Sequence, residues 1–576
     1  MHAMDGLQAP PAEPGTSPPG DDISTEPTSL ASSPEVTEVT EVIERGGASP
    51  GGQAAHDDAD DVGPTLSPRL SRLLVIGAVA VVVVGIVLRF VATSDMWLDE
   101  ALTLNISRLP LGQIHAALRR DGAPPLYYYL LHFWSGAFGT SDTAVRALSG
   151  VLSCATLPLI WLAGRRLGGK TVAAGALVLV ATSPFAVRYA TENRMYALVG
   201  LLTAAGVVAL QQAFRRRTAA NLVAVALLTG LLLYTHYWAL YLVGVTVLWL
   251  AFQAWRGPEQ RRRGARGALA AMLVGCVTFV PWVPTFLYQA HHTGTPWAKP
   301  ADFAAMVNAV TSFAGGATNQ GRALALVYFA LVGLGLFGVA RGAFHIDLDL
   351  RTRPRGRALA IVLVGTLAAA VTGGYVSKSA FQARYASVVF VPLVLLVALG
   401  LMTFANDRIR AGVLTATVAF GLASGLPSAW TSRTQAGEVA ATLAQLGRPG
   451  DVVAFCPDQI GPSVNRLVPP GRYREITFPR GTSPEFVDWV DYASASAAGH
   501  PASFAARLER MSAPSHQIWL VWAPGYQTFG TKCEQIEADL LADTSLGAHE
   551  MFPYAQVSDS WITYESMELV RFVHVG

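Results

Sequence analysis

Apolar runs of membrane-spanning length recur along most of this chain and limit it to one class of fold. Of its 576 residues, 52% are hydrophobic and only 14% are charged, which excludes an ordinary soluble protein. The first run covers about Leu73 to Val91. Further runs centre near residues 153, 179, 204, 228, 246, 275, 332, 367, 396 and 419. Since a spanning helix needs about 20 apolar residues, we predict a polytopic α-helical membrane protein with about 11 spans.

One apolar segment, Pro124 to Trp134, is too short to span. Its roughly 13 helical residues would cover about 20 Å, less than a bilayer core. If it did span, every Lys/Arg-rich connection that follows would face outside, against the positive-inside bias. We therefore predict an interfacial helix on the outer leaflet, at a depth that suits its tyrosines and Trp134. Its apolar stripe would consist of Leu126, Leu130, Phe133 and Ala137.

The composition divides the chain into three parts. Residues 1–66 are rich in Pro, Gly, Ser, Thr and acidic residues, which predicts a disordered acidic tail. Arginines just before the first span place this tail in the cytoplasm. Residues 67–430 form the predicted transmembrane domain, with a long first outer loop at 93–142. Residues 431–576 show alternating helix and strand patterns, which predict an extracytoplasmic α/β domain. The whole chain is then a multi-pass protein of the cell membrane.

The four cysteines do not suggest a metal site. They form no CxxC motif and no Cys/His cluster at metal-ligand spacing, so no structural zinc is expected. Cys154 and Cys276 lie in apolar runs and are interpreted as core residues. Cys456 and Cys533 lie in the polar C-terminal part, where they can pair if that part is outside the cytoplasm.

Two adjacent carboxylates, Asp99 and Glu100, follow the first span, just after a tryptophan suited to the lipid–water interface. Acidic groups at a membrane are costly, so they are functional candidates. The alternative is a solvated loop start that happens to be acidic.

The predicted topology gathers further polar residues on the same outer side. They are Asp121, Arg188, Glu192, Arg194, His236, Lys378 and Arg384. Carboxylates beside arginines suit an anionic lipid head group together with a hydroxyl that needs deprotonation. A transporter would hold charges near the bilayer midplane, where these spans are nearly free of them, so we favour surface chemistry.

Plainer interpretations exist for individual members of this set. His236 suits an aromatic cap at the interface, and Arg188 and Arg194 can simply balance Glu192 in a surface pair. Lys378 can extend its amine to the interface without contacting a substrate.

Several short motifs occur in a fixed order along residues 71 to about 260. They are Trp97-Leu98-Asp99-Glu100-Ala101, Asp121-Gly122-Ala123-Pro124-Pro125-Leu126-Tyr127-Tyr128, Arg146-Ala147-Leu148-Ser149, Arg194-Met195-Tyr196-Ala197-Leu198, Tyr234-Thr235-His236-Tyr237 and the later Arg384-Tyr385. With these motifs the chain resembles the GT-C glycosyltransferase superfamily. The resemblance is to its family 39-like branch, related to protein O-mannosyltransferases and lipid A aminoarabinose transferases.

This resemblance implies an inverting enzyme that moves a sugar, such as mannose or arabinose, from a polyprenyl-phosphate carrier to an acceptor on the outer face. Asp99 would be the general base, and Glu100 or Glu192 would orient the acceptor hydroxyl. Other substrate contacts would come from Tyr127, Tyr128, Arg194, His236, Tyr237, Lys378 and Arg384.

The expected partners are membrane lipid, the lipid-linked sugar and a glycan, glycolipid or protein acceptor, without nucleic acid. No cofactor is expected, and a divalent metal stays open. Two other classes compete with this hypothesis. One is a non-enzymatic flippase or transporter of lipid-linked sugars, and the other is a membrane anchor whose outer domain binds cell-envelope polymer. If the chain is a flippase or transporter, its function would survive neutralisation of Asp99. If it is a membrane anchor, the C-terminal domain alone would retain the function.

Overall fold

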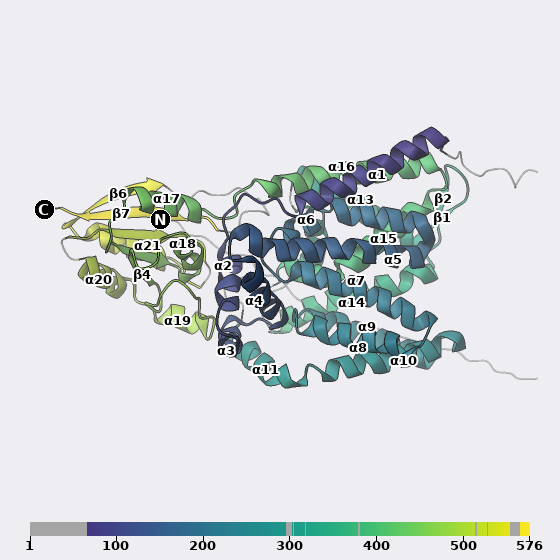
Figure 1. The fold of residues 1–576 in the computed structure, drawn as a ribbon, viewed down its shortest axis with the longest axis horizontal. Helices are drawn as coiled ribbons and strands as arrows, with labels where there is room; N and C mark the ends of the chain where they lie inside the picture. The colour runs from purple at the N-terminus through teal and green to yellow at the C-terminus, as the bar shows by residue number, and fades with distance from the viewer. Residues whose placement is uncertain are drawn as a thin grey trace, which may run out of the picture. The chain divides into compact units, whose positions relative to one another are not determined.

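The computed structural model of the chain describes residues 66–294, 302, 304–316, 318–377, 381–512, 515–526, 528–552 and 565–575. Long helices make up the first part of this range, and a mixed sheet with short helices makes up the last part (Figure 1).

The long helices coincide with the apolar runs. They are α1 (Pro68–Leu88), α5 (Asp142–Thr182), α7 (Tyr196–Arg215), α8 (Ala219–Leu233), α9 (Ala239–Arg256), α10 (Glu259–Val277), α13 (Asn319–Phe337), α14 (Pro354–Ser377), α15 (Phe390–Gly400) and α16 (Asp407–Gly425). Each of the predicted centres lies in one of them. Among the described residues, nine helical stretches are long and apolar enough to cross a membrane.

The difference between nine stretches and about 11 predicted spans arises at two helices. α5 has 41 residues and loses its helical backbone angles at Gly168 and Gly169. Gly169 has a φ of +86°, which an L side chain rarely adopts, so the glycine allows the chain to turn there. α8 has only 15 residues and covers about 22 Å. The number of spans therefore stays a prediction.

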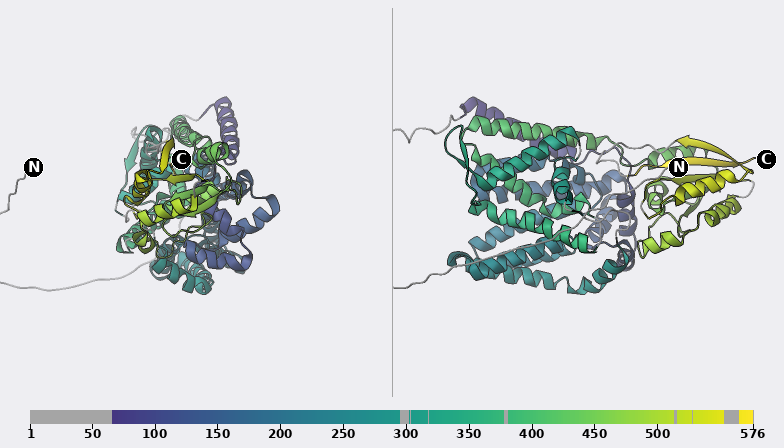
Figure 2. Two further views of the ribbon diagram at one scale, coloured as in Figure 1. Left: turned by 90° about the vertical axis from the view of Figure 1, so that its left-hand side faces the viewer. Right: turned by 180° about the vertical axis from the view of Figure 1, so that it is seen from behind.

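Further short helices lie between the long ones along the chain. They are α2 (Leu98–Ser107), α3 (Leu111–Asp121), α4 (Leu126–Phe138), α6 (Pro184–Ala190), α11 (Val283–His292) and α12 (Ala304–Phe313). Figures 1 and 2 place α2, α3 and α4 together at the ends of the long helices, next to the C-terminal part. This arrangement brings the first predicted loop against the C-terminal domain.

α4 is the short helix expected from the double proline, and it has 13 residues. The predicted stripe faces outward, because Leu130 is 37% exposed and Phe133 is 64% exposed. Tyr127 and Tyr128 point the other way and are completely buried. They are not interfacial rings as expected, because their hydroxyl groups find hydrogen-bond partners inside the protein.

The C-terminal part is an α/β domain with one five-stranded sheet. Its strands are β3 (Val452–Cys456), β4 (Arg474–Thr477), β5 (Ile518–Trp522), β6 (Leu546–Phe552) and β7 (Glu568–His574). The order is β4-β3-β5-β7-β6; β3 pairs in parallel with β4 and β5, whereas β7 is antiparallel to β5 and β6. All residues of β3 and β5 are buried, as expected for central strands covered on both faces.

Helices surround this sheet, namely α17 (Ala436–Leu446), α18 (Gly461–Asn465), α19 (Tyr492–Ala498), α20 (Pro501–Ser512) and α21 (Lys532–Ala542). A disulfide joins Cys456, at the end of β3, to Cys533 in α21, which confirms the predicted pairing. A small hairpin of β1 (Gly338–Ala340) and β2 (Ile346–Leu348) lies in a connection between long helices and was not expected.

Candidate active site

A cavity of about 1060 Å³ lies where the membrane helices meet the C-terminal domain. From the membrane region its lining includes Asp99, Arg194, Tyr196, His236, Arg384 and Tyr385. From the C-terminal domain it includes Gln459, Trp489, Tyr492, Tyr526 and Glu565. Ligand sites are commonly found in such concave spaces between domains.

Asp99 lies beside two arginines in this cavity. It is the second residue of α2, and the N-terminus of a helix favours a negative charge. Its Oδ2 atom lies 3.3 Å from Nη2 of Arg384 and 3.7 Å from Nη2 of Arg194. The Asp99 side chain is 17% exposed. The carboxylate is therefore accessible from the cavity and has positive charge on two sides.

Arg194 is held from behind by α2 and α4. Its Nη1 donates to Oγ1 of Thr103 at 2.7 Å and reaches the hydroxyl oxygen of Tyr128 at 3.5 Å. The Tyr128 hydroxyl itself donates to Oδ2 of Asp121 at 2.8 Å. Burial raises the pKa of Asp121. Tyr128 thus supports the arginine from outside the cavity.

Arg384 comes from a different part of the chain, the 3-10 helix at Ala383–Val389. Its guanidinium carbon lies 5.2 Å from the ring centre of Trp97 and 5.8 Å from that of Tyr385. Aromatic faces attract cations at such distances. The two rings therefore fix the guanidinium group near Asp99.

His236 is a neutral member of the site. Burial, with Arg194 and Arg384 nearby, lowers its pKa to about 3. Its Nδ1 accepts a hydrogen bond from the backbone N–H of Trp238 at 3.1 Å. In the neutral ring the proton is then on Nε2. His236, which lines the cavity, is therefore an uncharged ring with one N–H donor.

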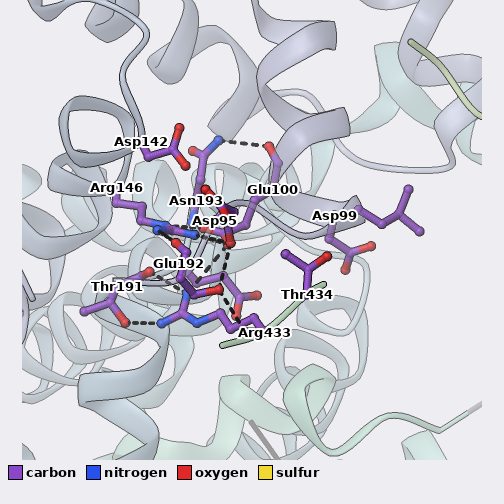
Figure 3. Close-up of polar contacts among 12 residues, drawn as sticks. Asp95, Asp99, Glu100, Asp142, Arg146, Thr191, Glu192, Asn193, Arg433 and Thr434 are labelled. Carbon is purple, nitrogen blue, oxygen red and sulfur yellow. Dashed lines mark hydrogen bonds and ion pairs between the residues drawn. The ribbon is translucent and has the colours of Figure 1, made fainter. Parts of the chain in front are cut away.

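Glu100 belongs to a separate buried cluster (Figure 3). Arg146 donates to it from Nε at 2.7 Å and from Nη2 at 2.6 Å. The backbone N–H of Asn193 donates to Glu100 Oε1 at 2.8 Å, and Nη1 of Arg433 lies 3.6 Å from Oε2. Although burial opposes ionisation, Arg146 and then Arg433 lower the pKa of Glu100 to about 2. The cluster ties α2 to α5 and to the segment around Arg194.

Glu192 is paired in the same buried layer. Its Oε2 lies 3.0 Å from Nη1 of Arg188, and neither side chain is exposed. Arg433 donates to the carbonyl oxygen and the hydroxyl of the neighbouring Thr191, both at 2.7 Å. This layer links the membrane region to the start of the C-terminal domain.

Glu565 is a site residue that sequence reasoning missed. Its Oε1 accepts from the backbone N–H of Leu98 at 3.3 Å, and its Oε2 accepts from the Thr434 hydroxyl at 2.6 Å. Burial, opposed by the bond to Thr434, raises its pKa to about 8. Because 467 residues separate Glu565 from Leu98, no local pattern could have indicated this contact.

The predicted site residues thus fall into two groups. Asp99, Arg194, His236, Tyr237 and Arg384 line the cavity. Glu100, Glu192, Tyr127 and Tyr128 are buried beside it and do not line it. Lys378 lies outside the described residues.

The side chains of the second group contact protein and not the cavity, because α2, α4 and the turn between α6 and α7 point them inward. The Tyr127 hydroxyl, for example, contacts Oγ of Ser149 at 2.9 Å and donates to Oδ1 of Asn193 at 3.1 Å. Tyr237, which does line the cavity, donates to Gln289 and accepts from Nε1 of Trp282 at 3.0 Å. In the described part of the chain, no three His, Cys, Asp or Glu side chains are grouped so that they could hold a metal ion.

Comparisons with known proteins agree with this fold. Residues 122–283 match the model of a family described as dolichyl-phosphate-mannose-protein mannosyltransferase. That range includes Arg194 and His236, whereas Asp99 and Arg384 lie outside it. No curated protein sequence matches the chain.

Two solved structures share the fold at low sequence identity. One is ArnT from Cupriavidus metallidurans bound to undecaprenyl phosphate, with 13% identity, a TM-score of 0.50 and coverage of 88% of this chain and 98% of that chain. The other is the oligosaccharyltransferase AglB from Archaeoglobus fulgidus in complex with an inhibitory peptide and a dolichol-phosphate. It has 12% identity, a TM-score of 0.51 and coverage of 82% of this chain and 72% of that chain. With its apolar helices, this fold makes the chain a multi-pass membrane protein.

Proposed function

We propose that the chain is a GT-C glycosyltransferase that transfers a sugar from a polyprenyl phosphate to an acceptor outside the cytoplasm, which its family match over residues 122–283 and its fold support. The transfer inverts the anomeric carbon. Mannosyl and arabinosyl phosphates are the donors we favour, and the acceptor is a glycan, lipid or protein of the cell envelope.

The observation that carries this proposal is the position of Asp99 between Arg194 and Arg384 on the wall of the cavity. The buried atom Arg194 Nε has no hydrogen-bond partner among the described residues. Buried polar atoms in proteins are normally paired. Here a phosphate oxygen would supply the partner, and the acceptor hydroxyl would approach the exposed side of the Asp99 carboxylate.

The reaction follows from this geometry. The acceptor hydroxyl approaches the anomeric carbon from the side opposite the phosphate, and Asp99 takes its proton. A new bond forms between the acceptor oxygen and the anomeric carbon, while the bond to the phosphate oxygen breaks with its electron pair. Arg194 and Arg384 stabilise the charge that develops on the departing polyprenyl phosphate. One such donor is typically worth about 3 kcal/mol.

The membrane region and the C-terminal domain would have different roles at the cavity. The structural relatives were solved with undecaprenyl phosphate and dolichol-phosphate, and the same class of lipid carrier would reach this cavity from the membrane side. The C-terminal domain closes the cavity on the other side, and we place it and the cavity outside the cytoplasm, at the cell membrane. The N-terminal tail is then cytoplasmic.

The test uses the purified full-length chain and labelled polyprenyl-phosphate sugars. Asp99→Asn keeps the shape of the side chain but cannot take a proton, so the transfer rate should fall by about 10²–10⁴-fold. Donor binding should persist, because both arginines are retained. Arg384→Ala should weaken donor binding as well as rate, and Arg384→Lys should restore only part of both.

An exposed ion pair provides matched controls. Arg341 and Asp347 lie 2.6 Å apart outside the cavity, so Asp347→Asn and Arg341→Ala should leave transfer unchanged. Transfer by Asp99→Asn at the parental rate would remove Asp99 as the base. Donor translocation without any transfer would favour a flippase.

A further inference from the structure

The C-terminal wall of the cavity differs chemically from the membrane wall. Its lining residues are Gln459, Trp489, Asp491, Tyr492, Ser494 and Tyr526, together with Ala493 and Glu565. Among the described residues of this wall are three aromatic rings and several groups that bond hydroxyls, but no Lys or Arg. The membrane wall, in contrast, contains Arg194 and Arg384. The two walls therefore suit different parts of the substrates.

Trp489 is the best placed aromatic ring on this wall. It is half-buried, and its ring centre lies 5.0 Å from that of Tyr492. Tyr492 is buried, donates to Asp458 and accepts from Nε2 of Gln459 at 3.2 Å. Because Tyr492 is fixed in this way, Trp489 rests on a rigid support. Binding a ligand to a ring that is already ordered costs little conformational entropy.

The charges on this wall argue against an anionic ligand there. Of its two acidic residues, Asp491 carries the charge, because the pKa of Glu565 is raised to about 8 by burial and this carboxyl is mostly protonated at neutral pH. The nearby His292, at the end of α11, lies 3.1 Å from Oδ1 of Asp491 through its Nδ1. A phosphate on this side would face the Asp491 carboxylate, and like charges disfavour binding. The anion is better placed at the two arginines on the opposite wall.

We propose that this wall is the acceptor subsite and that it takes a neutral carbohydrate, one sugar ring of which stacks on Trp489. The apolar face of a pyranose or furanose ring matches the indole, and its hydroxyls match Gln459, Asp491 and Ser494. The inference rests on the proposed function and narrows its acceptor from glycan, lipid or protein to a neutral glycan. Another hydroxyl of the same glycan would then point towards Asp99.

Two measurements on the full-length protein test this assignment. The first is binding of mannotriose and arabinotriose without donor, followed by saturation-transfer NMR. The second is transfer from the labelled donor to the same trisaccharides, to phosphorylated mannotriose and to a threonine-rich peptide. Slow hydrolysis of the donor by water reports on the donor side alone.

Two substitutions of Trp489 distinguish the loss of its aromatic ring from a loss of the fold. Trp489→Ala should raise the KM for the trisaccharide about tenfold, the size expected for the loss of an aromatic contact, with donor hydrolysis unchanged. Trp489→Phe should recover most of the affinity. Trp430→Ala is the matched control, because Trp430 is 61% exposed and does not line the cavity.

The outcomes distinguish this inference from the proposed function. Trisaccharide binding that Trp489→Ala weakens, in a protein that neither hydrolyses nor transfers any donor, would retain the subsite and reject the enzyme. Normal donor hydrolysis with an unchanged trisaccharide KM in Trp489→Ala would overturn the subsite. Preference for the peptide or for the phosphorylated sugar would also overturn it.

Discussion

The buried contact between Glu100 and Arg146 gives the sharpest prediction about how Asp99 is positioned. Glu100→Gln keeps the size of the side chain but removes its charge. The new amide would bring N–H groups towards Arg146, which now donates to both carboxylate oxygens. Arg433 would lose the same negative partner. We therefore expect the variant to be destabilised, in contrast to Asp99→Asn.

The structure gives the size of this effect in two ways. Lowering the pKa of Glu100 from its ordinary 4.5 to about 2 corresponds to about 3 kcal/mol of stabilisation of the folded state. Removing one partner of a buried ion pair costs about 3–5 kcal/mol, because the other charge stays buried. Since the pKa is lowered, this stability is present above about pH 4.5 and is lost as the pH falls through about 2.

Thermal unfolding of the purified protein in detergent measures this effect at neutral pH. We expect the apparent Tm of Glu100→Gln to fall by about 5 °C or more. Sugar transfer should fall as well, because α2 carries both residues and Asp99 would lose its fixed place. Asp99→Asn should lose transfer at a nearly parental Tm, and Asp347→Asn should change neither.

A different pattern would refute this reasoning. If Glu100→Gln unfolds at the parental temperature but has a raised KM for the acceptor, Glu100 contacts the acceptor, as the sequence resemblance implied. If both Tm and transfer are parental, the buried cluster does not position Asp99 at all.

Three further predictions concern the site and its orientation. Because the pKa of His236 is lowered to about 3, the residue is neutral throughout pH 5–8, so His236→Gln should leave the shape of the pH–rate profile unchanged in that range. Glu565→Gln should transfer sugar almost normally, whereas Glu565→Ala should lower turnover about three- to tenfold, since the Leu98 N–H loses its acceptor. In a background without Cys154 and Cys276, a cysteine at the exposed Thr544 should be labelled in intact cells, and one at the exposed Arg261 only after lysis.

Much of the fold could be predicted because it depends on local patterns. Apolar runs fixed the positions of the long helices, and the double proline with a short apolar run predicted α4. In the C-terminal domain, the alternating helix and strand patterns predicted an α/β domain, and the five-stranded sheet with its helices agrees with it. The predicted topology brought Asp99, Arg194 and Arg384 to one side of the membrane, and the structure places a guanidinium nitrogen of each arginine within 4 Å of the Asp99 carboxylate.

The roles of neighbouring residues could not be predicted in the same way. Asp99 and Glu100 follow one another on a helix, where successive side chains point about 100° apart. Only one of the two can therefore face the cavity, and the sequence does not say which. The structure turns Asp99 to the cavity and Glu100 to Arg146. Glu565 illustrates a second limit, because its contact with α2 exists only once the C-terminal domain is docked.

The distribution of buried charge connects these observations to the donor. Arg146, Arg188 and Arg433 are neutralised in part by Glu100 and Glu192, away from the cavity. Arg194 and Arg384 both lie beside the carboxylate of Asp99, at distances longer than a normal hydrogen bond. Buried cations require a close anionic partner. A donor phosphate between these two guanidinium groups would be a further anionic partner, and it would draw them away from Asp99, which would leave the carboxylate open to the proton of the acceptor hydroxyl.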